Sequence, residues 1–332
     1  MSAAQARSRT AAFTPRDWVL LAAVALMWGS SFLLIEVGLR HLEPTAVTLL
    51  RVLFGALTLA CVPAARRPIA RADWRAVAVL GTVWIAAPFT LFPLAQESIS
   101  SSLAGMVNGA APLFTMLVAA VWARRVPTGR QLAGLGVGFA GVVAINLPAL
   151  QGADATALGA AMVLLATLFY GVAFNLAVPL EERNGALPVI WRAQLVALVL
   201  VSGPGIVGVA GSTWSWSSML AMVVLGALST GLAFAFFTML VGRVGAARGS
   251  VTVYFIPVVA IVLGVLLGDE SVALVALVGT ALVLLGAYLT SRQDKDPVAL
   301  SAGISDEGCR ADDVWQHDDS QHDDSRHDDK NG

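Results

Sequence analysis

Long apolar runs separated by short polar links make up most of the first 290 residues. Ten of these runs approach the length of about 20 predominantly apolar residues that a helix needs to cross a bilayer. They cover residues 18–39, 44–63, 76–96, 101–122, 131–148, 157–180, 187–210, 218–240, 247–268 and 272–290. No run alternates apolar and polar residues as a barrel strand would. The pattern therefore predicts an all-α integral membrane protein with ten transmembrane helices.

Composition agrees with a membrane location. Of the 332 residues, 57% are hydrophobic and 13% are charged, whereas a soluble domain carries about 25% charged residues. The mean hydropathy is +0.75, and so few polar side chains could not cover a soluble surface. The basic residues before the first apolar run imitate a signal peptide. Because further apolar runs follow that first run, we predict that it is a retained first transmembrane helix and not a cleaved signal peptide.

The arginines of the short links predict the orientation in the membrane, since cytoplasmic loops carry the excess of positive charge. If the N-terminus is cytoplasmic, Arg40 is the one basic residue in an outside loop. The inside segments then hold Arg7, Arg9, Arg16, Arg66, Arg67, Arg71, Arg75, Arg124, Arg125, Arg130, Arg183, Arg243 and Arg248. An even number of helices returns the chain to its starting side. We therefore expect a multi-pass protein of the inner (plasma) membrane with both termini cytoplasmic.

The two ends of the chain differ from the apolar body. Residues 1–17 form a short basic segment, and residues 291–332 carry 12 acidic and 5 basic side chains. The tail repeats the sequence QHDDS, QHDDS and RHDDK over 316–330. A segment of this composition cannot bury apolar area, so we predict a disordered, solvated cytoplasmic tail. Weak metal binding by its His-Asp repeat is the alternative.

Neither a cofactor nor a structural metal is predicted. There are two cysteines, Cys61 in an apolar run and Cys309 in the tail. Their number and spacing indicate neither a disulfide nor a zinc site. No basic patch is interleaved with aromatic residues, which argues against nucleic acid as a partner. The expected partners are the lipid bilayer and a small-molecule substrate.

The chain contains an internal repeat, which a shift of 145 residues reveals. Under this shift Leu80 falls on Leu225, Gly81 on Gly226, Phe89 on Phe234, Phe92 on Phe237, Pro112 on Pro257, Gly134 on Gly279 and Gly141 on Gly286. Near the start a shift of 142 residues places Trp28 on Tyr170, Gly29 on Gly171 and Phe32 on Phe174. The alternative is chance similarity among apolar helices, but the prolines and glycines keep one register across several helix pairs.

Each repeat holds five of the predicted helices, over residues 18–148 and 157–290. Because five is odd, the second repeat enters the membrane in the opposite orientation. Inverted repeats are typical of secondary transporters, whose substrate site lies near the midplane between the halves.

These features resemble the EamA-like members of the drug/metabolite transporter superfamily over residues 18–290. The matching segments are Trp28-Gly29, A-P-L-F at 111–114, the glycine-rich run at 130–142, I-P-V at 256–258 and G-D-E at 268–270. The resemblance implies a central cavity lined by the first, third, fourth, sixth, eighth and ninth helices. Each half of such proteins tends to end its fourth helix with Gly-Glu. Glu270 fits, thirteen residues after Pro257, but the equivalent position after Pro112 holds Arg125.

Aromatic, amide, hydroxyl and proline residues near the centres of those helices are candidates for the substrate cavity. They are Trp28, Trp84, Pro88, Asn108, Pro112, Tyr170, Ser229, Tyr254 and Pro257. Aromatic walls with a few polar groups suit an amphipathic organic solute. Packing between helices is the alternative for any one of them. Pro112 and Pro257 remove helix hydrogen bonds at equivalent positions, which predicts kinks that expose backbone groups or permit movement.

Three charged residues lie inside apolar runs and are candidates for function because charge is costly in a membrane. Glu36 and Arg51 are candidates for coupling transport to an ion gradient. Alternatively the two form a structural ion pair. Arg192 lies near the inner end of its helix, where its charge can extend into water.

Glycines in the fifth and tenth helices, at Gly134, Gly138, Gly141, Gly279 and Gly286, allow close helix contact. Packing within one chain is the first interpretation, and a homodimer face is the second.

The predicted function is a secondary transporter that exports small organic metabolites, amino acids or drugs by alternating access. A membrane-embedded enzyme is the alternative, but no histidine lies in an apolar run and no H-E-x-x-H motif or nucleophile elbow is present. A non-transporting scaffold would be expected to carry a sizeable outside domain, and the short links leave no room for one.

Overall fold

The computed structural model describes residues 14–124, 126–150, 154–249 and 251–291. Throughout this part every regular element is a helix. Most of the predicted N-terminal segment and nearly all of the predicted acidic tail, with its His-Asp repeat, lie outside the described residues, so the predictions for them stay untested.

The helices follow the predicted apolar runs closely. The first half contains α2 (Pro15–Gly29), α3 (Ser31–Leu39), α4 (Pro44–Ala60), η1 (Pro63–Arg66), η2 (Arg71–Asp73), α5 (Trp74–Leu80), η3 (Gly81–Ala86), α6 (Ala87–Ala95), α7 (Ser101–Asn108), α8 (Ala111–Ala123) and α9 (Gly129–Leu150). The second contains α10 (Asp154–Asn184), α11 (Ala186–Gly211), α12 (Trp216–Gly226), η4 (Ala227–Leu232), α13 (Ala233–Val244), α14 (Ala246–Gly249), α15 (Thr252–Leu267) and α16 (Leu274–Ser291).

Several helices are long and apolar enough to cross a membrane. By length and composition, 7 helical stretches of the described chain meet this condition, and three shorter apolar helices, Pro44–Ala60, Thr252–Leu267 and Leu274–Thr290, accompany them. The prediction of an all-helical, multi-pass membrane protein is confirmed. The arrangement of ten spanning helices in two repeats stays a prediction.

Local sequence signals mark where the helices begin and end. The Thr14 side chain accepts from the Asp17 backbone, and the Asp17 side chain reaches back to the Thr14 backbone, so the two form a capping box before Pro15. Arg243 near the end of α13 forms an ion pair with the same Asp17. Between α10 and α11, Gly185 has a φ of 82°, a conformation that favours glycine and lets the chain reverse.

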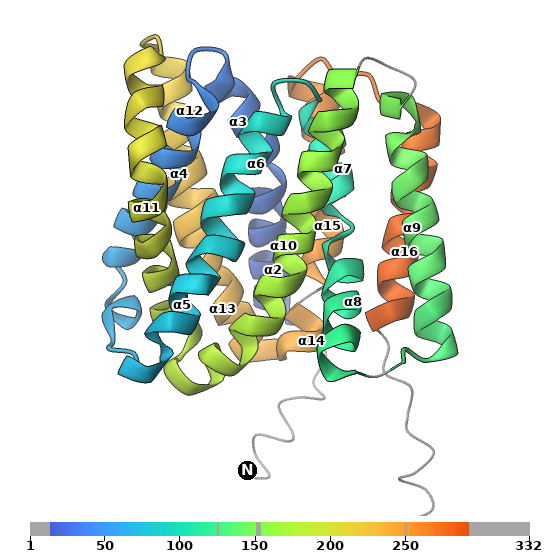
Figure 1. Cartoon of the computed structure of the whole chain (residues 1–332), viewed down its shortest axis with the longest axis horizontal. Helices are drawn as coiled ribbons and strands as arrows, with labels where there is room; N and C mark the ends of the chain where they lie inside the picture. The colour runs from blue at the N-terminus through green and yellow to red at the C-terminus, as the bar shows by residue number, and fades with distance from the viewer. Residues whose placement is uncertain (1–13, 125, 151–153, 250, 292–332) are drawn as a thin grey trace, which may run out of the picture. The chain divides into compact units, whose positions relative to one another are not determined.

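The predicted glycine faces pack against each other within the chain. Figure 1 shows α9 and α16 side by side at one edge of the helical body. A Cβ atom added at Gly134 would lie 2.9 Å from the Gly286 carbonyl oxygen, and one at Gly141 would lie 2.6 Å from that of Gly279. The two backbones therefore approach too closely for any larger residue. This contact accounts for the glycines within one chain, and the homodimer stays a prediction.

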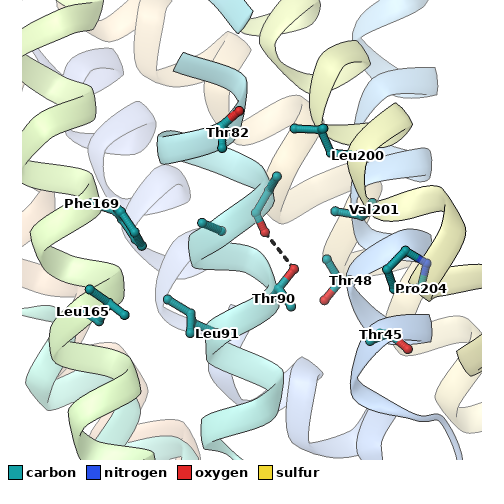
Figure 2. Close-up of a pocket in the computed structure, with 12 residues that line it drawn as sticks. Thr45, Thr48, Thr82, Thr90, Leu91, Leu165, Phe169, Leu200, Val201 and Pro204 are labelled. Atoms are coloured by element: carbon teal, nitrogen blue, oxygen red, sulfur yellow. Dashed lines mark hydrogen bonds between the residues drawn. The ribbon is translucent and has the colours of Figure 1, made fainter. Parts of the chain in front are cut away.

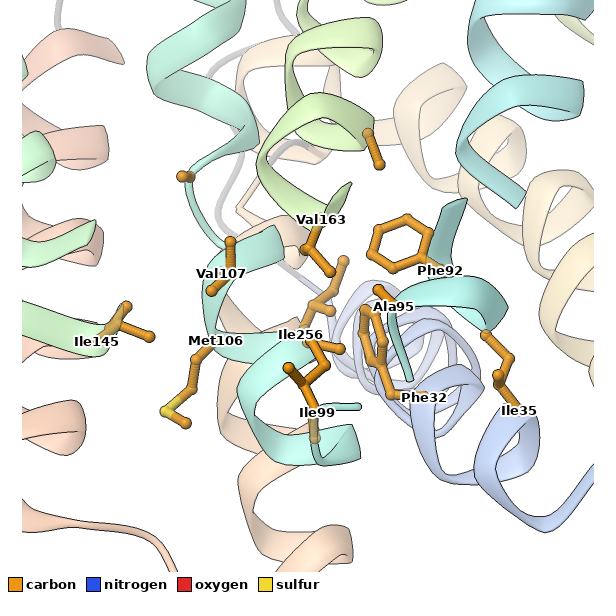
Figure 3. Packing of buried hydrophobic residues seen from close by; sticks show 14 of the residues in the cluster. Phe32, Ile35, Phe92, Ala95, Ile99, Met106, Val107, Ile145, Val163 and Ile256 are labelled. Carbon is orange, nitrogen blue, oxygen red and sulfur yellow. The ribbon is translucent and has the colours of Figure 1, made fainter. Parts of the chain in front are cut away.

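A buried apolar cluster joins both halves of the chain. In Figure 3, Phe32 from α3 and Phe92 from α6 face each other, with Val163 from α10 and Ile256 from α15 beside them. The two phenylalanine rings are 5.5 Å apart at an angle of 70°, a favourable edge-to-face geometry. The core is thus built by helices that are distant in sequence.

Two spans are interrupted by a turn of wider π-helix. These are η3, which begins at Gly81, and η4, which begins at Ala227. The two segments lie within one residue of the 145-residue register of the internal repeat. Single π-turns inside α-helices are rare and occur frequently at functional sites. Trp84 and Ser229, two of the predicted cavity residues, lie on them.

Candidate functional site

A continuous chain of aromatic rings lies inside the helical body. Trp28 of α2 contacts Phe234 of α13 at 5.9 Å between centroids, and Phe234 contacts Trp84 at 5.4 Å. Trp84 lies edge-on to Phe174 of α10 at 5.8 Å, and Phe174 stacks on Tyr170 at 5.9 Å. The structure therefore brings together three predicted cavity residues, Trp28, Trp84 and Tyr170. We call the five rings the aromatic cluster.

Arg51 lies beside the aromatic cluster in the middle of α4. Its side chain is only 6% exposed. The guanidinium carbon is 3.6 Å from the centre of the Phe89 ring, a cation–π contact. Its Nε donates a hydrogen bond of 3.1 Å to Thr230 Oγ1, and Phe89 belongs to the same buried group of residues as Trp84 and Phe234.

The π-turn η4 positions the partner of Arg51. Thr230 Oγ1 accepts from Arg51 and donates to the Leu225 carbonyl, five residues earlier, at 3.0 Å. Glycines let α4 approach this segment, because a Cβ added at Gly226 would lie 2.8 Å from the Arg51 carbonyl oxygen. The neighbouring Ser229 is buried, and its hydroxyl has no hydrogen-bond partner among the described residues.

A pair of carboxyl groups lies near the junction of α3 and α4. Glu270 follows α15, and its carboxylate accepts from Ser101 N at 2.7 Å, Ser101 Oγ at 2.6 Å and Ser102 N at 2.9 Å. This places a negative charge at the N-terminus of α7, where the helix dipole favours it. Burial raises the pKa of Glu270, but the hydrogen bonds from Ser101 and Ser102 outweigh it and hold that pKa below its ordinary value.

Glu36 interacts with the Glu270 carboxyl group rather than with Arg51. Its Oε1 is 3.7 Å from Arg40, which is 58% exposed, and its Oε2 is buried without a partner among the described residues. The ion pair between Glu36 and Arg51 that the sequence left open is not formed, because each residue contacts a different partner.

Two pockets are lined by residues outside the aromatic cluster. One, of about 410 Å³, is lined by Glu36, Arg40, Glu43, Gln96 and Glu97 together with apolar residues. Figure 2 shows the other, a groove of about 450 Å³ between α4, α6, α10 and α11.

The groove between α4, α6, α10 and α11 offers a solute few polar groups. The hydroxyls of Thr48, Thr82 and Thr90 all donate to backbone carbonyls, so they have no proton left to donate. Neither this groove nor the smaller pocket is lined by the predicted cavity residues.

The remaining predicted cavity residues are divided between two places. Pro88 lies at the start of α6, directly before Phe89. Asn108, Pro112, Tyr254 and Pro257 lie instead on α7, α8 and α15. Asn108 is 7% exposed, and its Oδ1 has no partner among the described residues. The Tyr254 hydroxyl donates to the Ala287 carbonyl at 3.1 Å, which is a packing contact between helices.

The two symmetry-related prolines differ in their surroundings. Pro112 lies in the first turn of α8, where a missing N–H costs nothing, after a break between α7 and α8. Pro257 lies inside α15, and a Cβ added at Gly109 in that break would lie 2.8 Å from its ring. One proline therefore begins a helix and the other lies within one. This differs from the matched kinks that the sequence predicted.

The sequence predicted that Arg192 extends its charge into water, but the structure buries it. It is 9% exposed, and its terminal nitrogens donate to the carbonyls of Ala65, Pro188 and Arg66 at 3.1, 3.3 and 3.4 Å. The Ala65 and Arg66 carbonyls lie at the end of the 3₁₀ turn η1 and lack helical partners, so Arg192 satisfies them and stays buried.

Two polar residues that lie against α4, at Arg51 or one turn after it, were not predicted from the sequence. Thr230 follows the predicted Ser229, and Gln194 is the one side-chain amide in the apolar run at 187–210. Gln194 is 0% exposed, and neither Oε1 nor Nε2 has a hydrogen-bond partner among the described residues. A lone amide in an apolar run is the signal that would have identified it.

Comparisons with known proteins agree with the helical architecture. A model of the EamA-like transporter family matches residues 17–147 and again residues 157–292. A solved protein structure has the same fold over 83% of this chain and 96% of its own, with a TM-score of 0.56 and 19% identity.

Relatives of similar length carry transporter names. An "Uncharacterized transporter" of Archaeoglobus fulgidus is 27% identical over 84% of this chain and 99% of its own. A "Probable terminal-alkyne amino-acid exporter" of Streptantibioticus cattleyicolor is 29% identical over 83% and 93%. A "Probable amino-acid metabolite efflux pump" of Escherichia coli is 26% identical over 82% and 94%.

Proposed function

Because this chain belongs to the EamA-like transporter family, we propose that it exports small organic metabolites of the amino-acid type by alternating access. The buried aromatic cluster with Arg51 beside it carries this proposal. It offers apolar walls and a fixed charge, as a site for an amphipathic solute needs. The names of two relatives, which concern amino-acid export, support the same solute class. The enzyme and scaffold alternatives are not favoured.

The proposed architecture is ten transmembrane helices in two inverted repeats, over residues 18–148 and 157–290. The double match of the family model supports this division. The paired π-turns support it too, since Trp84 and Ser229 occupy equivalent positions in the 145-residue register. Matched irregular segments in two repeats are typical of transporter binding sites.

The proposed location is the inner (plasma) membrane, with both termini in the cytoplasm. The support is the distribution of arginine between alternate loops, which follows the positive-inside rule.

The proposed cavity wall is formed by Trp28, Trp84, Pro88, Tyr170 and Ser229. The second group, Asn108, Pro112, Tyr254 and Pro257, surrounds the break between α7 and α8. In this proposal the second group permits movement of the helices rather than contact with the solute. In hinge movements, residues at the ends of helices commonly take up the change in backbone φ and ψ angles.

Glu36 is the proposed coupling residue, together with Glu270. Two neighbouring carboxylates repel each other, and one proton held between them relieves that repulsion. A pair of this kind can load and release a proton as the surrounding helices move.

Flux in proteoliposomes tests the transport proposal. Purified protein is reconstituted with radiolabelled leucine, phenylalanine and other amino acids inside, and efflux is measured with and without a proton gradient. We expect efflux of at least one amino acid above that of protein-free vesicles. Equal rates in protein-free and protein-containing vesicles for every solute would overturn the proposal.

A further inference from the structure

Arg51 carries a buried positive charge that no acidic residue of the described chain neutralises. The ion pairs in this part of the chain join Glu36 to Arg40, Asp73 to Arg183 and Asp17 to Arg243. An arginine stays protonated in a protein. Burying a charge without an opposite charge costs several kcal/mol. A partner of opposite charge is therefore expected to come from outside this part of the chain.

The free nitrogens of Arg51 point to the form of that partner. Among the described residues, its one hydrogen bond is the one from Nε to Thr230. The four N–H groups of Nη1 and Nη2 thus remain as donors. Arg192, the other buried arginine, directs both terminal nitrogens at backbone carbonyls. The terminal nitrogens of Arg192 are therefore satisfied within the chain, whereas those of Arg51 have no partner among the described residues.

Gln194 is a second, independent group, and it lies one turn of α4 away from Arg51. It is fully buried, with an unpartnered amide. Gly55 lies one turn after Arg51 on α4, and a Cβ added there would meet Thr230 at 2.8 Å and Gln194 Oε1 at 3.2 Å. The side chains of Thr230 and Gln194 therefore converge on the turn of α4 that follows Arg51.

We propose that Arg51 and Gln194 form a subsite for the carboxylate of the transported solute, an inference that rests on the proposed export of amino acids. A guanidinium offers two parallel N–H groups that match the two oxygens of a carboxylate. With Nε held by Thr230, the pair Nη1 and Nη2 is that fork, and the Gln194 amide adds a third donor.

The aromatic cluster completes the subsite. Phe89 lies under the guanidinium and belongs to the same buried group of residues as Trp84 and Phe234 of the aromatic cluster. Tyr170 is joined through Phe174 to Trp84. An amino acid whose carboxylate binds Arg51 would place its side chain against these rings. The subsite therefore selects a solute with a carboxylate at one end and an apolar side chain at the other.

Binding of matched acids and amides tests this subsite. Affinities of the purified full-length protein in detergent are measured by calorimetry and thermal shift for leucine with leucinamide, and phenylalanine with phenylalaninamide. We expect the wild type to bind an acid more tightly than its amide. Removing one member of a buried charge pair costs 2 kcal/mol or more, so Arg51→Gln should weaken acid binding about 30-fold and abolish the preference.

Three further variants make the result specific. Arg51→Lys keeps the charge but loses the fork, so it should retain only part of the preference, and it replaces Arg51→Gln if that protein fails to fold. Gln194→Leu should weaken the acid more than the amide. Arg192→Gln is the matched control, since it removes a buried arginine of structural role and should keep the preference for acids.

Three outcomes would overturn the carboxylate subsite. They are wild-type binding of amides as tight as acids, acid preference that survives Arg51→Gln, and binding of none of the four compounds. Failure of the transport proposal is seen separately. In that case the acids bind in an Arg51-dependent way, yet proteoliposomes show no flux.

Discussion

At the scale of single residues, the carboxylate of Glu270 ties the loop after α15 to the start of α7. It accepts three hydrogen bonds from Ser101 and Ser102, which satisfy backbone N–H groups that have no partner within the helix. The family resemblance had placed a glutamate here, but its contacts join helices that are far apart in sequence. A residue expected only from a motif therefore has a stabilising role of its own.

Glu270→Gln should destabilise the protein at neutral pH. The amide keeps the shape but removes the charge, which should cost about 1–3 kcal/mol. The folded protein lowers the pKa of Glu270. The stabilisation is therefore present above the ordinary carboxyl pKa of about 4.3 and is lost as pH falls through the lower, folded value.

Thermal unfolding in detergent at pH 7 and at pH 3 measures this effect. The wild type should unfold at a higher temperature than Glu270→Gln at pH 7, and the gap between the two proteins should narrow at pH 3. Glu97→Gln, at an exposed acid of the same end of the molecule, is the control and should resemble the wild type. A difference in unfolding temperature of equal size at both pH values would show that the negative charge of Glu270 does not stabilise the protein.

Glu36→Gln should separate proton coupling from substrate binding. If Glu36 loads the proton, the variant loses export driven by a proton gradient but keeps exchange of substrate across the membrane. Its ion pair with Arg40 is partly exposed and 3.7 Å long, and exposed pairs contribute about 0–1 kcal/mol, so the free energy of unfolding should change little. Arg40→Gln breaks the same pair and serves as the control. Export driven by the proton gradient at the wild-type rate in Glu36→Gln would show that Glu36 is not the coupling residue.

At the scale of helices, the apolar pattern predicts where each helix lies in the sequence. It does not predict irregular turns within a helix. The run at 76–96 corresponds to the helical stretch Arg71–Ala95, because a span must be long and apolar wherever it lies. The π-turn within it, η3, has no comparable signal. An extra residue per turn changes which side chains face the neighbouring helices, and hydropathy does not register that change.

The site shows the same limit for contacts between helices. Trp28, Trp84 and Tyr170 were predicted separately and lie in one cluster, since large aromatic residues near span centres are drawn to the core. The partners of Arg51 and Glu36 could not be inferred. Partner choice depends on helix rotation and on glycine contacts such as that of Gly226 with α4, and a repeat register fixes neither.

At the scale of the whole molecule, arginine distribution and the internal repeat both favour an odd number of spans in each half. Residues 18–148 then begin and end on opposite sides of the membrane, and residues 157–290 return the chain to its starting side. If either half had an even number of spans, the alternation of arginine-rich and arginine-poor links would fail from that point onward.

Reporter fusions test this arrangement. A phosphatase reporter, active outside, and a fluorescent reporter, active inside, are fused after Gly152 and after Gly332. The first site should report the outside and the second the cytoplasm, because five spans precede the first site and ten precede the second. A third fusion after Arg67, which two spans precede, is the control and should report the cytoplasm. The same compartment at Gly152 and Gly332 would show that the second half contains an even number of spans, so the proposed inverted repeat would be wrong.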